Sequence, residues 1–170
     1  MNSAGLQIIK DSEGFYSKPY KDPGYGIPTI GYGNTFYPDG TKVKLTDSPI
    51  SQSKANEILL TIVSNFEREV KKRITSKVNE NQLSALVSFA YNNGVKNFQD
   101  STLLKKVNIN PNDKTIREEF NRWIYANKKV MNGLVIRRKK EADLYEKSIY
   151  KTAVLIPLIL FLYTVFTVTV

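Results

Sequence analysis

The chain has 170 residues, with 25 Lys and Arg against 16 Asp and Glu, a formal net charge of +9, and neither Cys nor His. A chain of this length forms one domain of ordinary size and can bury a hydrophobic core. The two missing residue types exclude a disulfide framework, thiol catalysis, Ser-His-Asp chemistry and nearly all zinc sites. Carboxylates are therefore the acid and base groups available near neutral pH. Because no Asp-x-Asp-x-Asp-Gly loop appears, we expect no metal and no cofactor.

Two carboxylates near the N-terminus have different surroundings. Residues 3–12 carry three large apolar side chains and predict a short helix that stops near Gly14, a good left-handed cap residue. Glu13 then lies at the helix C-terminus, where the last carbonyls disfavour a second negative charge, so it should hold its proton more readily. Asp22 lies in a Pro- and Gly-rich turn segment, where a solvated carboxylate stays ionised.

A hydroxyl follows these two carboxylates. Thr29 begins the β-prone run Thr-Ile-Gly-Tyr-Gly, whose glycines allow close approach, and its hydroxyl is placed to hold a water against Asp22. Hydrolysis of a glycosidic bond needs one carboxylic acid to protonate the leaving oxygen and a second, ionised carboxylate. Glu13 and Asp22 fit those roles. A capping Glu with turn residues in a surface hairpin is the plain alternative, and the residues alone leave both open.

The middle of the chain predicts helices. Segment 51–74 has apolar residues at helical spacing along one face and is expected to join two lobes as one long helix. A second helix precedes the Asn92-Asn93-Gly94 stop. A third apolar stripe surrounds Trp123, which we expect to pack in the core instead of stacking on a sugar. Aromatic residues that could line a groove for sugar rings gather in the N-terminal part: Tyr25, Tyr32, Phe36 and Tyr37.

Three blocks of sequence resemble the phage-type lysozymes, the endolysins similar to the T4 and lambdoid-phage muramidases. In the first, Glu13 is followed after eight residues by Asp22, then by a Gly-containing spacer and the run from Thr29 to Gly33, which resembles the catalytic signature of that family. The second block, residues 81–94 with Phe98 and 101–104, resembles the family's central helix and the turn after it. The third block, residues 120–125 with 133–145, resembles its Trp helix and its last helix, which has the pattern Gly-Leu-x-x-Arg-Arg-x-x-Glu. The blocks keep the family's order over residues 1–149.

This resemblance implies an α+β, lysozyme-like fold over residues 1–150, with a small N-terminal β lobe, a larger helical lobe, a long connecting helix and a cleft between the lobes. It implies a muramidase that hydrolyses the β-1,4 bond between N-acetylmuramic acid and N-acetylglucosamine in peptidoglycan, with inversion, and lyses the host cell. The family's catalytic residues carry over to Glu13, Asp22 and Thr29. Candidate substrate-binding residues are Tyr25, Gly31, Tyr32, Gly33, Phe98 and Arg137.

Three details qualify the match. The family usually has five residues between the Asp and the Thr, whereas this chain has six, so we expect a bulge or a longer turn to absorb the extra residue. Asn34 stands where some relatives carry His. If Arg137 or Arg138 reaches Glu13, it favours the ionised carboxylate and opposes the acid role until substrate binds.

The segment 128–140 contains six basic residues and no acid. Such a surface attracts polyanions, of which the bacterial cell wall is one. Nucleic acid is the rival polyanion, but no helix-turn-helix, zinc-finger or RNP signature appears, and we expect no nucleic-acid partner. A solvated helix face is the plain alternative.

Residues 153–170 form an uncharged tail. As a helix it would span about 27 Å, slightly less than a ~30 Å hydrocarbon core, so it is a marginal membrane anchor. A docked hydrophobic element and a non-native or frameshifted tail are the alternatives. Lys147 and Lys151 precede it, and the positive-inside rule would keep the enzyme domain in the cytoplasm.

No signal peptide is recognised at the N-terminus. We therefore expect synthesis in the host cytoplasm, action on the cell wall as a monomer, and release through a separate pore-forming protein, as in many phage lysozymes. Two rival functions stay open. A lytic transglycosylase would need the same Glu but no water-activating Asp, and a non-catalytic wall-binding or nucleic-acid-binding protein would not use Glu13.

Overall fold

A computed structural model describes residues 1–24 and 26–147. Tyr25 and the tail at 153–170, both named above, lie outside these residues. The helices are α1 Ser3–Glu13, α2 Gln52–Lys71, α3 Glu80–Asn93, α4 Val95–Asp100, α5 Thr102–Ile109, α6 Ile116–Asn121 and α7 Asn132–Glu146. The strands are β1 Tyr16–Lys21, β2 Pro28–Gly31, β3 Tyr125–Ala126 and β4 Lys129–Val130.

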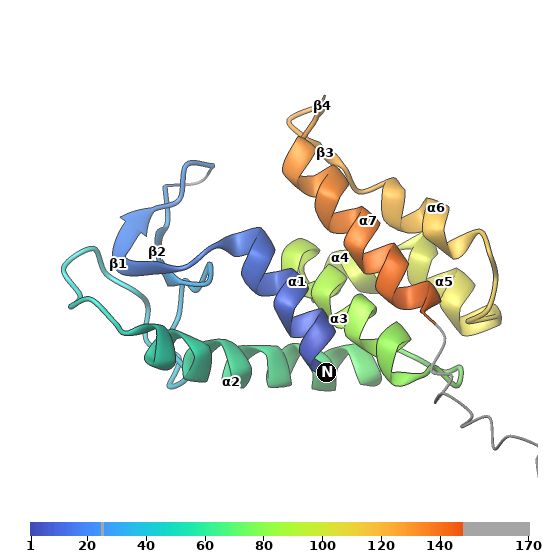
Figure 1. Ribbon diagram of the computed structural model, residues 1–170, viewed down its shortest axis with the longest axis horizontal. Helices are drawn as coiled ribbons and strands as arrows, with labels where there is room; N and C mark the ends of the chain where they lie inside the picture. Colours follow the sequence, from blue (N-terminus) through green and yellow to red (C-terminus); the bar gives the residue numbers. More distant parts are fainter. Residues whose placement is uncertain (25, 148–170) are drawn as a thin grey trace, which may run out of the picture.

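The elements form a small N-terminal lobe and a larger helical lobe (Figure 1). Strands β1 and β2 pair antiparallel, with Tyr20 opposite Thr29, and a bulge interrupts the register between Tyr16 and Tyr20. Helix α2 runs along both lobes, while α3 to α7 and most of α1 make up the helical lobe (Figure 1). The predicted α+β architecture with a long connecting helix is therefore confirmed.

Local sequence explains where the first two helices begin and end. The side chain of Asn2 accepts from the Gly5 N–H to start α1, and that of Ser51 accepts from the Lys54 N–H to start α2. Helix α2 ends at Lys71, three residues before the predicted Ile74. The reason is a tighter last turn, in which the N–H groups after Lys72 bond to carbonyls three residues back.

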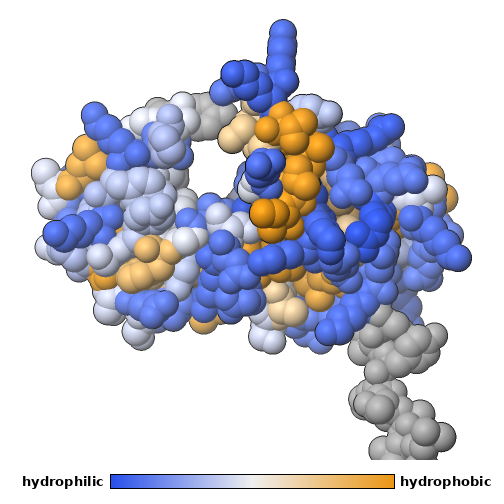
Figure 2. Space-filling model, turned by 45° about the horizontal axis from the view of Figure 1, so that its top comes forward, coloured by the Kyte–Doolittle hydropathy of each residue, from blue (hydrophilic) through white to orange (hydrophobic). Residues whose placement is uncertain are grey.

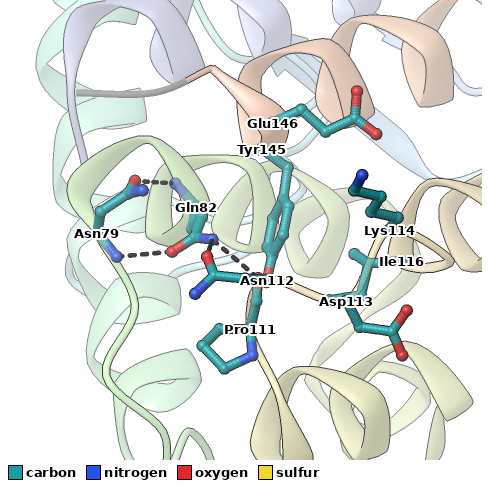
Figure 3. Close-up of a pocket in the computed structure, with 9 residues that line it drawn as sticks. All are labelled: Asn79, Gln82, Pro111, Asn112, Asp113, Lys114, Ile116, Tyr145 and Glu146. Carbon is teal, nitrogen blue, oxygen red and sulfur yellow. Dashed lines mark hydrogen bonds between the residues drawn. The ribbon is translucent and has the colours of Figure 1, made fainter. Parts of the chain in front are cut away.

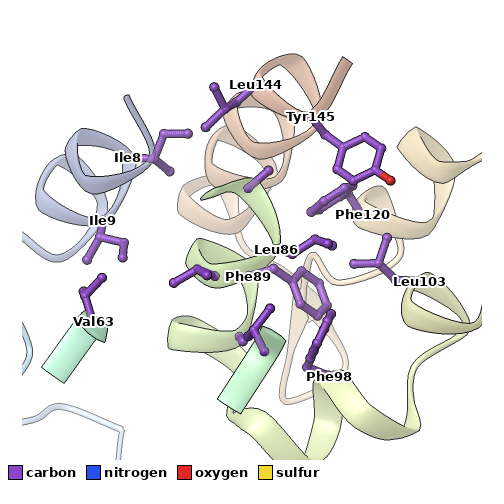
Figure 4. Close-up of a cluster of buried hydrophobic side chains, with 14 of the residues drawn as sticks. Ile8, Ile9, Val63, Leu86, Phe89, Phe98, Leu103, Phe120, Leu144 and Tyr145 are labelled. Atoms are coloured by element: carbon purple, nitrogen blue, oxygen red, sulfur yellow. The ribbon is translucent and has the colours of Figure 1, made fainter. Parts of the chain in front are cut away.

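The hydrophobic core is built around α3, which lies against α1, α2 and α7 (Figure 4). Every residue from Ser84 to Ala90 is buried, so this helix has no exposed face along that stretch. At its centre the ring of Phe89 meets Phe120 and Trp123 edge-on, with ring centroids 5.7 and 5.2 Å apart. The core therefore joins helices that come from widely separated parts of the sequence.

Two aromatic residues differ from the sequence-based expectations. Trp123 lies beyond the end of α6 at Asn121, so the expected helix stops before it, although its ring packs in the core as predicted. Phe98 is a correction: its side chain is 0% exposed and packs against Phe89, so it offers no surface to a substrate. Within residues 1–24 and 26–147, no helix has both the length and the apolar character needed to cross a membrane.

Candidate active site

Glu13 is the last residue of α1, as the sequence predicted. Gly14 ends the helix with φ +70°, and its N–H bonds to the Lys10 carbonyl. The chain then turns into β1, which leaves the Glu13 side chain 23% exposed between the two lobes. Its Oε1 accepts a 2.6 Å hydrogen bond from Nη1 of Arg137, so of the two candidate arginines, 137 and 138, it is Arg137 that reaches Glu13.

The backbone of Gly33 lies directly against the Glu13 carboxylate. Its φ is +79°, and a Cβ at this position would stand 2.9 Å from Glu13 Oε2. This turn is tied to α3, because the Tyr91 hydroxyl donates to the Tyr32 carbonyl at 2.8 Å and accepts from Asn34 Nδ2 at 3.3 Å. Asn34, where some relatives carry His, thus has a structural role in fixing the backbone that faces Glu13.

Asp22 follows β1 and begins the turn to β2. Its backbone N–H donates to the Ile27 carbonyl, while the Gly24 N–H donates to Asp22 Oδ1 at 3.0 Å. The bond from the Asp22 N–H to the Ile27 carbonyl brings the two ends of the six-residue spacer together. Thr29 begins the part of β2 that is buried, at 3% exposure, and its hydroxyl donates to the Ile27 carbonyl at 2.9 Å.

The phenol of Tyr20 is affected by the charges of both candidate carboxylates, Glu13 and Asp22. Burial raises the pKa of Tyr20, and the Tyr16 hydroxyl raises it further when ionised. The negative charges of Glu13 and Asp22 act on the same hydroxyl in the same direction. Both carboxylates therefore lie within electrostatic reach of one side chain. Sequence reasoning missed Tyr20, although its place two residues before Asp22 in an alternating strand was an available signal.

Arg137 joins Glu13 to a buried group of charges on α7. Its Nε lies 3.2 Å from Oε1 of Glu141, and its Nη2 donates to the Ser88 carbonyl at 3.2 Å. Burial lowers the pKa of Arg138 to about 10, although Glu141 opposes the fall. Burial also raises the pKa of Glu141, against the effect of Arg138 and Arg137. Arg137 was predicted as a substrate-binding candidate. In the structure its side chain is only 3% exposed and contacts Glu13.

The remaining predicted site residues contribute mainly through their backbones. Gly31 is buried with φ +66°, and Tyr32 is only 4% exposed. The Tyr32 ring packs on Phe15 and lies beneath the Lys10 ammonium, so it belongs to the core instead of a sugar platform. Phe36 is 46% exposed and remains available to a ligand.

Two concave regions adjoin this cluster. Figure 2 shows a deep hollow between the N-terminal lobe and the helical lobe. A cavity of about 440 Å³ lies beside the Gly33 turn. Its lining comes from the N-terminal lobe and from α2 and α3 and includes Gly33, Asn34, Thr35, Phe36, Tyr37, Phe66 and Tyr91. Side chains with hydroxyl, amide and aromatic groups make this lining suitable for a sugar.

A further cavity, of about 480 Å³, lies at the other end of α7 (Figure 3). The Gln82 amide and the Tyr145 hydroxyl both donate to the Pro111 carbonyl there, at 2.9 Å each. These bonds join α3 and α7 to the loop before α6, which is a structural role. Among the described residues, no cluster of three or more acidic side chains stands ready to hold a metal ion.

Four of the six basic residues in the segment 128–140 form ion pairs within the fold. Arg137 and Arg138 are buried against Glu141. On the surface, Lys139 pairs with Asp143, and Lys140 pairs with Asp11 of α1 at 2.7 Å. The lysines at 128 and 129 lie in and after the turn between β3 and β4.

Comparison with known proteins agrees with this geometry. The endolysin of Bacillus phage B103 is 38% identical over 146 residues, which cover 85% of this chain and 53% of that protein. The endolysin of Salmonella phage P22 is 32% identical over 145 residues, which cover 85% of this chain and 97% of that protein. A solved structure of the endolysin from Escherichia coli O157:H7 phage FAHEc1 matches with a TM-score of 0.77 and 38% identity, over 88% of this chain and 94% of that one.

The chain spans about half the length of the endolysins of Bacillus phages B103 and PZA. A family model described as phage lysozyme matches residues 10–141, which include Glu13, Asp22, Thr29 and Arg137. From this match, the relatives and the fold, the chain belongs to the phage lysozyme family.

Proposed function

We propose that this protein is a muramidase that hydrolyses the β-1,4 bond between N-acetylmuramic acid and N-acetylglucosamine in peptidoglycan. The observation that carries the proposal is the placement of Glu13. It ends α1 between the two lobes, in contact with Arg137 and the Gly33 backbone, and its charge raises the pKa of Tyr20, as that of Asp22 does. Two carboxylates near one cleft are the minimum machinery for glycoside hydrolysis.

In this mechanism Glu13 donates a proton to the leaving glycosidic oxygen. Asp22, held in its turn by the Gly24 N–H, activates water or stabilises the charge that develops on the sugar ring. Thr29 assists by accepting a hydrogen bond from that water, because its own proton is donated to the Ile27 carbonyl. By resemblance to the T4-type enzymes we propose inversion at the anomeric carbon.

Substrate binding is assigned to the hollow between the lobes and the adjoining cavity. The turn from Gly31 to Gly33 lets a sugar approach the backbone closely next to Glu13. Phe36 and Tyr37 line the cavity and supply aromatic faces, and Tyr91 also lines it. These groups can hold a sugar ring beside the Gly33 turn, which lies against Glu13.

The test uses purified bacterial walls and follows both turbidity and new reducing ends. Glu13→Gln should abolish both signals, because the amide of Gln is not acidic enough to protonate the leaving oxygen, and Asp22→Ala should reduce both by orders of magnitude. Glu57→Gln, a change at an exposed carboxylate of α2, serves as the control and should leave both signals intact. If Asp22→Ala still clears the wall suspension fully and releases anhydro-sugar products, the protein is instead a lytic transglycosylase.

We also propose that the enzyme acts on the host wall after release through a separate pore-forming protein, and that residues 153–170 anchor it to the membrane until then. The apolar sequence of that segment supports the anchor. Truncation after Lys151 should move the protein from the membrane fraction to the soluble fraction of host cells. An unchanged distribution would reject the anchor and leave the muramidase proposal intact.

A further inference from the structure

The carboxylate of Glu141 is buried behind the candidate active site, and the reaction proposed above does not use it. Its side chain is 0% exposed. Oε1 accepts a hydrogen bond from the Ser88 hydroxyl at 2.7 Å and lies 3.2 Å from nitrogens of both Arg137 and Arg138. A buried charge is costly unless it is paired and hydrogen-bonded, so this arrangement calls for an explanation beyond packing.

The contacts of Arg137 show what Glu141 holds in place. Its guanidinium bonds through Nε to Glu141, through Nη2 to the Ser88 carbonyl and through Nη1 to Glu13. Glu141 follows Arg137 by four residues on α7, so the two side chains meet on one face of the same helix. The guanidinium is therefore fixed by its own helix and by α3, and its remaining nitrogen is aimed at Glu13.

We propose that Glu141 is a positioning residue for Glu13: it fixes Arg137 against the Glu13 carboxylate and balances the charge of Arg137 and Arg138. The inference rests on the proposed role of Glu13 as the acid. With Glu13 ionised, the two carboxylates and two guanidinium groups are neutral in sum. When Glu13 takes up a proton the group gains one positive charge, and without Glu141 it would carry two. Glu141 therefore keeps the protonated form of Glu13 accessible.

Other charged and titratable groups surround this cluster, and the substitution of Glu141 does not replace any of them. From α3 the cluster faces Tyr91, whose pKa is raised by burial and by Glu13. From α6, Arg117 pairs at the other end of α7. The groups on α1 and in the N-terminal lobe are Lys10, Asp11 with its partner Lys140, Tyr16, Tyr20 and Asp22.

The experiment measures the release of reducing ends from purified walls as a function of pH, with the full chain. Glu141→Gln keeps the size of the side chain and removes its charge. Because two uncompensated cations then disfavour a proton on Glu13, the alkaline limb of the kcat/KM profile should move to lower pH by roughly half to one unit. An alkaline limb that coincides with the wild-type limb, or moves to higher pH, overturns the inference.

Glu119→Gln is the matched control. Glu119 is also buried, at 3% exposure, and pairs with Lys106 and Thr102 on the far side of the helical lobe from Glu13. Both variants should lower the thermal unfolding midpoint, but the control should leave the alkaline limb in place. An equal shift in both variants would mean that burial of any carboxylate has this effect, and it would overturn the inference.

Two further variants separate the possible failures. Glu13→Gln in the same assay tests the proposed function, which fails if this variant stays active. If Glu13→Gln is inactive but Glu141→Gln leaves the pH profile unshifted, only the inference is overturned. Should Glu141→Gln fail to fold, Glu141→Asp keeps the charge but withdraws it from Arg137 by one methylene. Compared with the control Glu119→Asp, Glu141→Asp should move the alkaline limb to lower pH, by less than Glu141→Gln would. If the limb does not move, the inference is overturned.

Discussion

Replacing Gly33 by Ala tests whether the backbone turn beside Glu13 positions that carboxylate. Gly33 has φ +79°, a conformation that costs an alanine about 1–2 kcal/mol. For a chain of this size the loss corresponds to a fall of roughly 2–8 °C in the thermal unfolding midpoint. The new Cβ would also stand 2.9 Å from Glu13 Oε2, closer than van der Waals contact allows.

The flexible Glu13 side chain can relieve this overlap only by moving away from Gly33. Because its Oε1 is bonded to Arg137 at 2.6 Å, the carboxylate must rotate or shift on that anchor. A displacement of about 1 Å at a reacting group costs on the order of a hundredfold in rate. We therefore expect Gly33→Ala to lose about two orders of magnitude in the release of reducing ends from walls, measured on protein that calorimetry shows to be folded.

Gly40→Ala provides the matched control for backbone strain. Gly40 has φ +86°, but an added Cβ would meet nothing within 4 Å. The two variants should therefore lose similar stability, while only Gly33→Ala loses activity. Full activity in Gly33→Ala, or an equal loss in both variants, would refute the argument that contact with Glu13 is what matters.

Three further outcomes test the core, a helix cap and the response to acid. Phe89→Ala should destabilise the protein by about 3–5 kcal/mol and shift the emission of Trp123, the only tryptophan in the chain, because its ring packs on Phe89. Asn79→Ala removes one half of the capping box of α3 and should cost about 1 kcal/mol in urea unfolding. Burial alone would raise the pKa of Glu119. Lys106, Thr102 and Arg122 more than offset this effect, so the pKa of Glu119 is lowered from 4.5. The stability that ionised Glu119 contributes is therefore present above pH 4.5 and is lost as the pH falls through its folded pKa. Glu119→Gln should flatten the plot of unfolding free energy against pH in that range, and an unchanged slope would contradict the reasoning.

The sequence by itself determined the local features of the site and of the main helices. The apolar side chains before Gly14 placed Glu13 at the end of α1, and the 3.6-residue spacing predicted α2 and α3. These features depend on residues within a turn or two of one another, so periodicity and capping rules capture them. The same rules set the end of α2 only to within three residues.

Tertiary structure alone decided which distant residues meet. Glu13 and Arg137 are 124 positions apart, and nothing local separates Arg137, which reaches Glu13, from Arg138, which is enclosed. The burial of Phe98 and the pairing of Lys140 with Asp11 of α1 likewise follow from contacts with other helices. Because the charge of a side chain is felt through its neighbours in space, its role is fixed only when the helices pack.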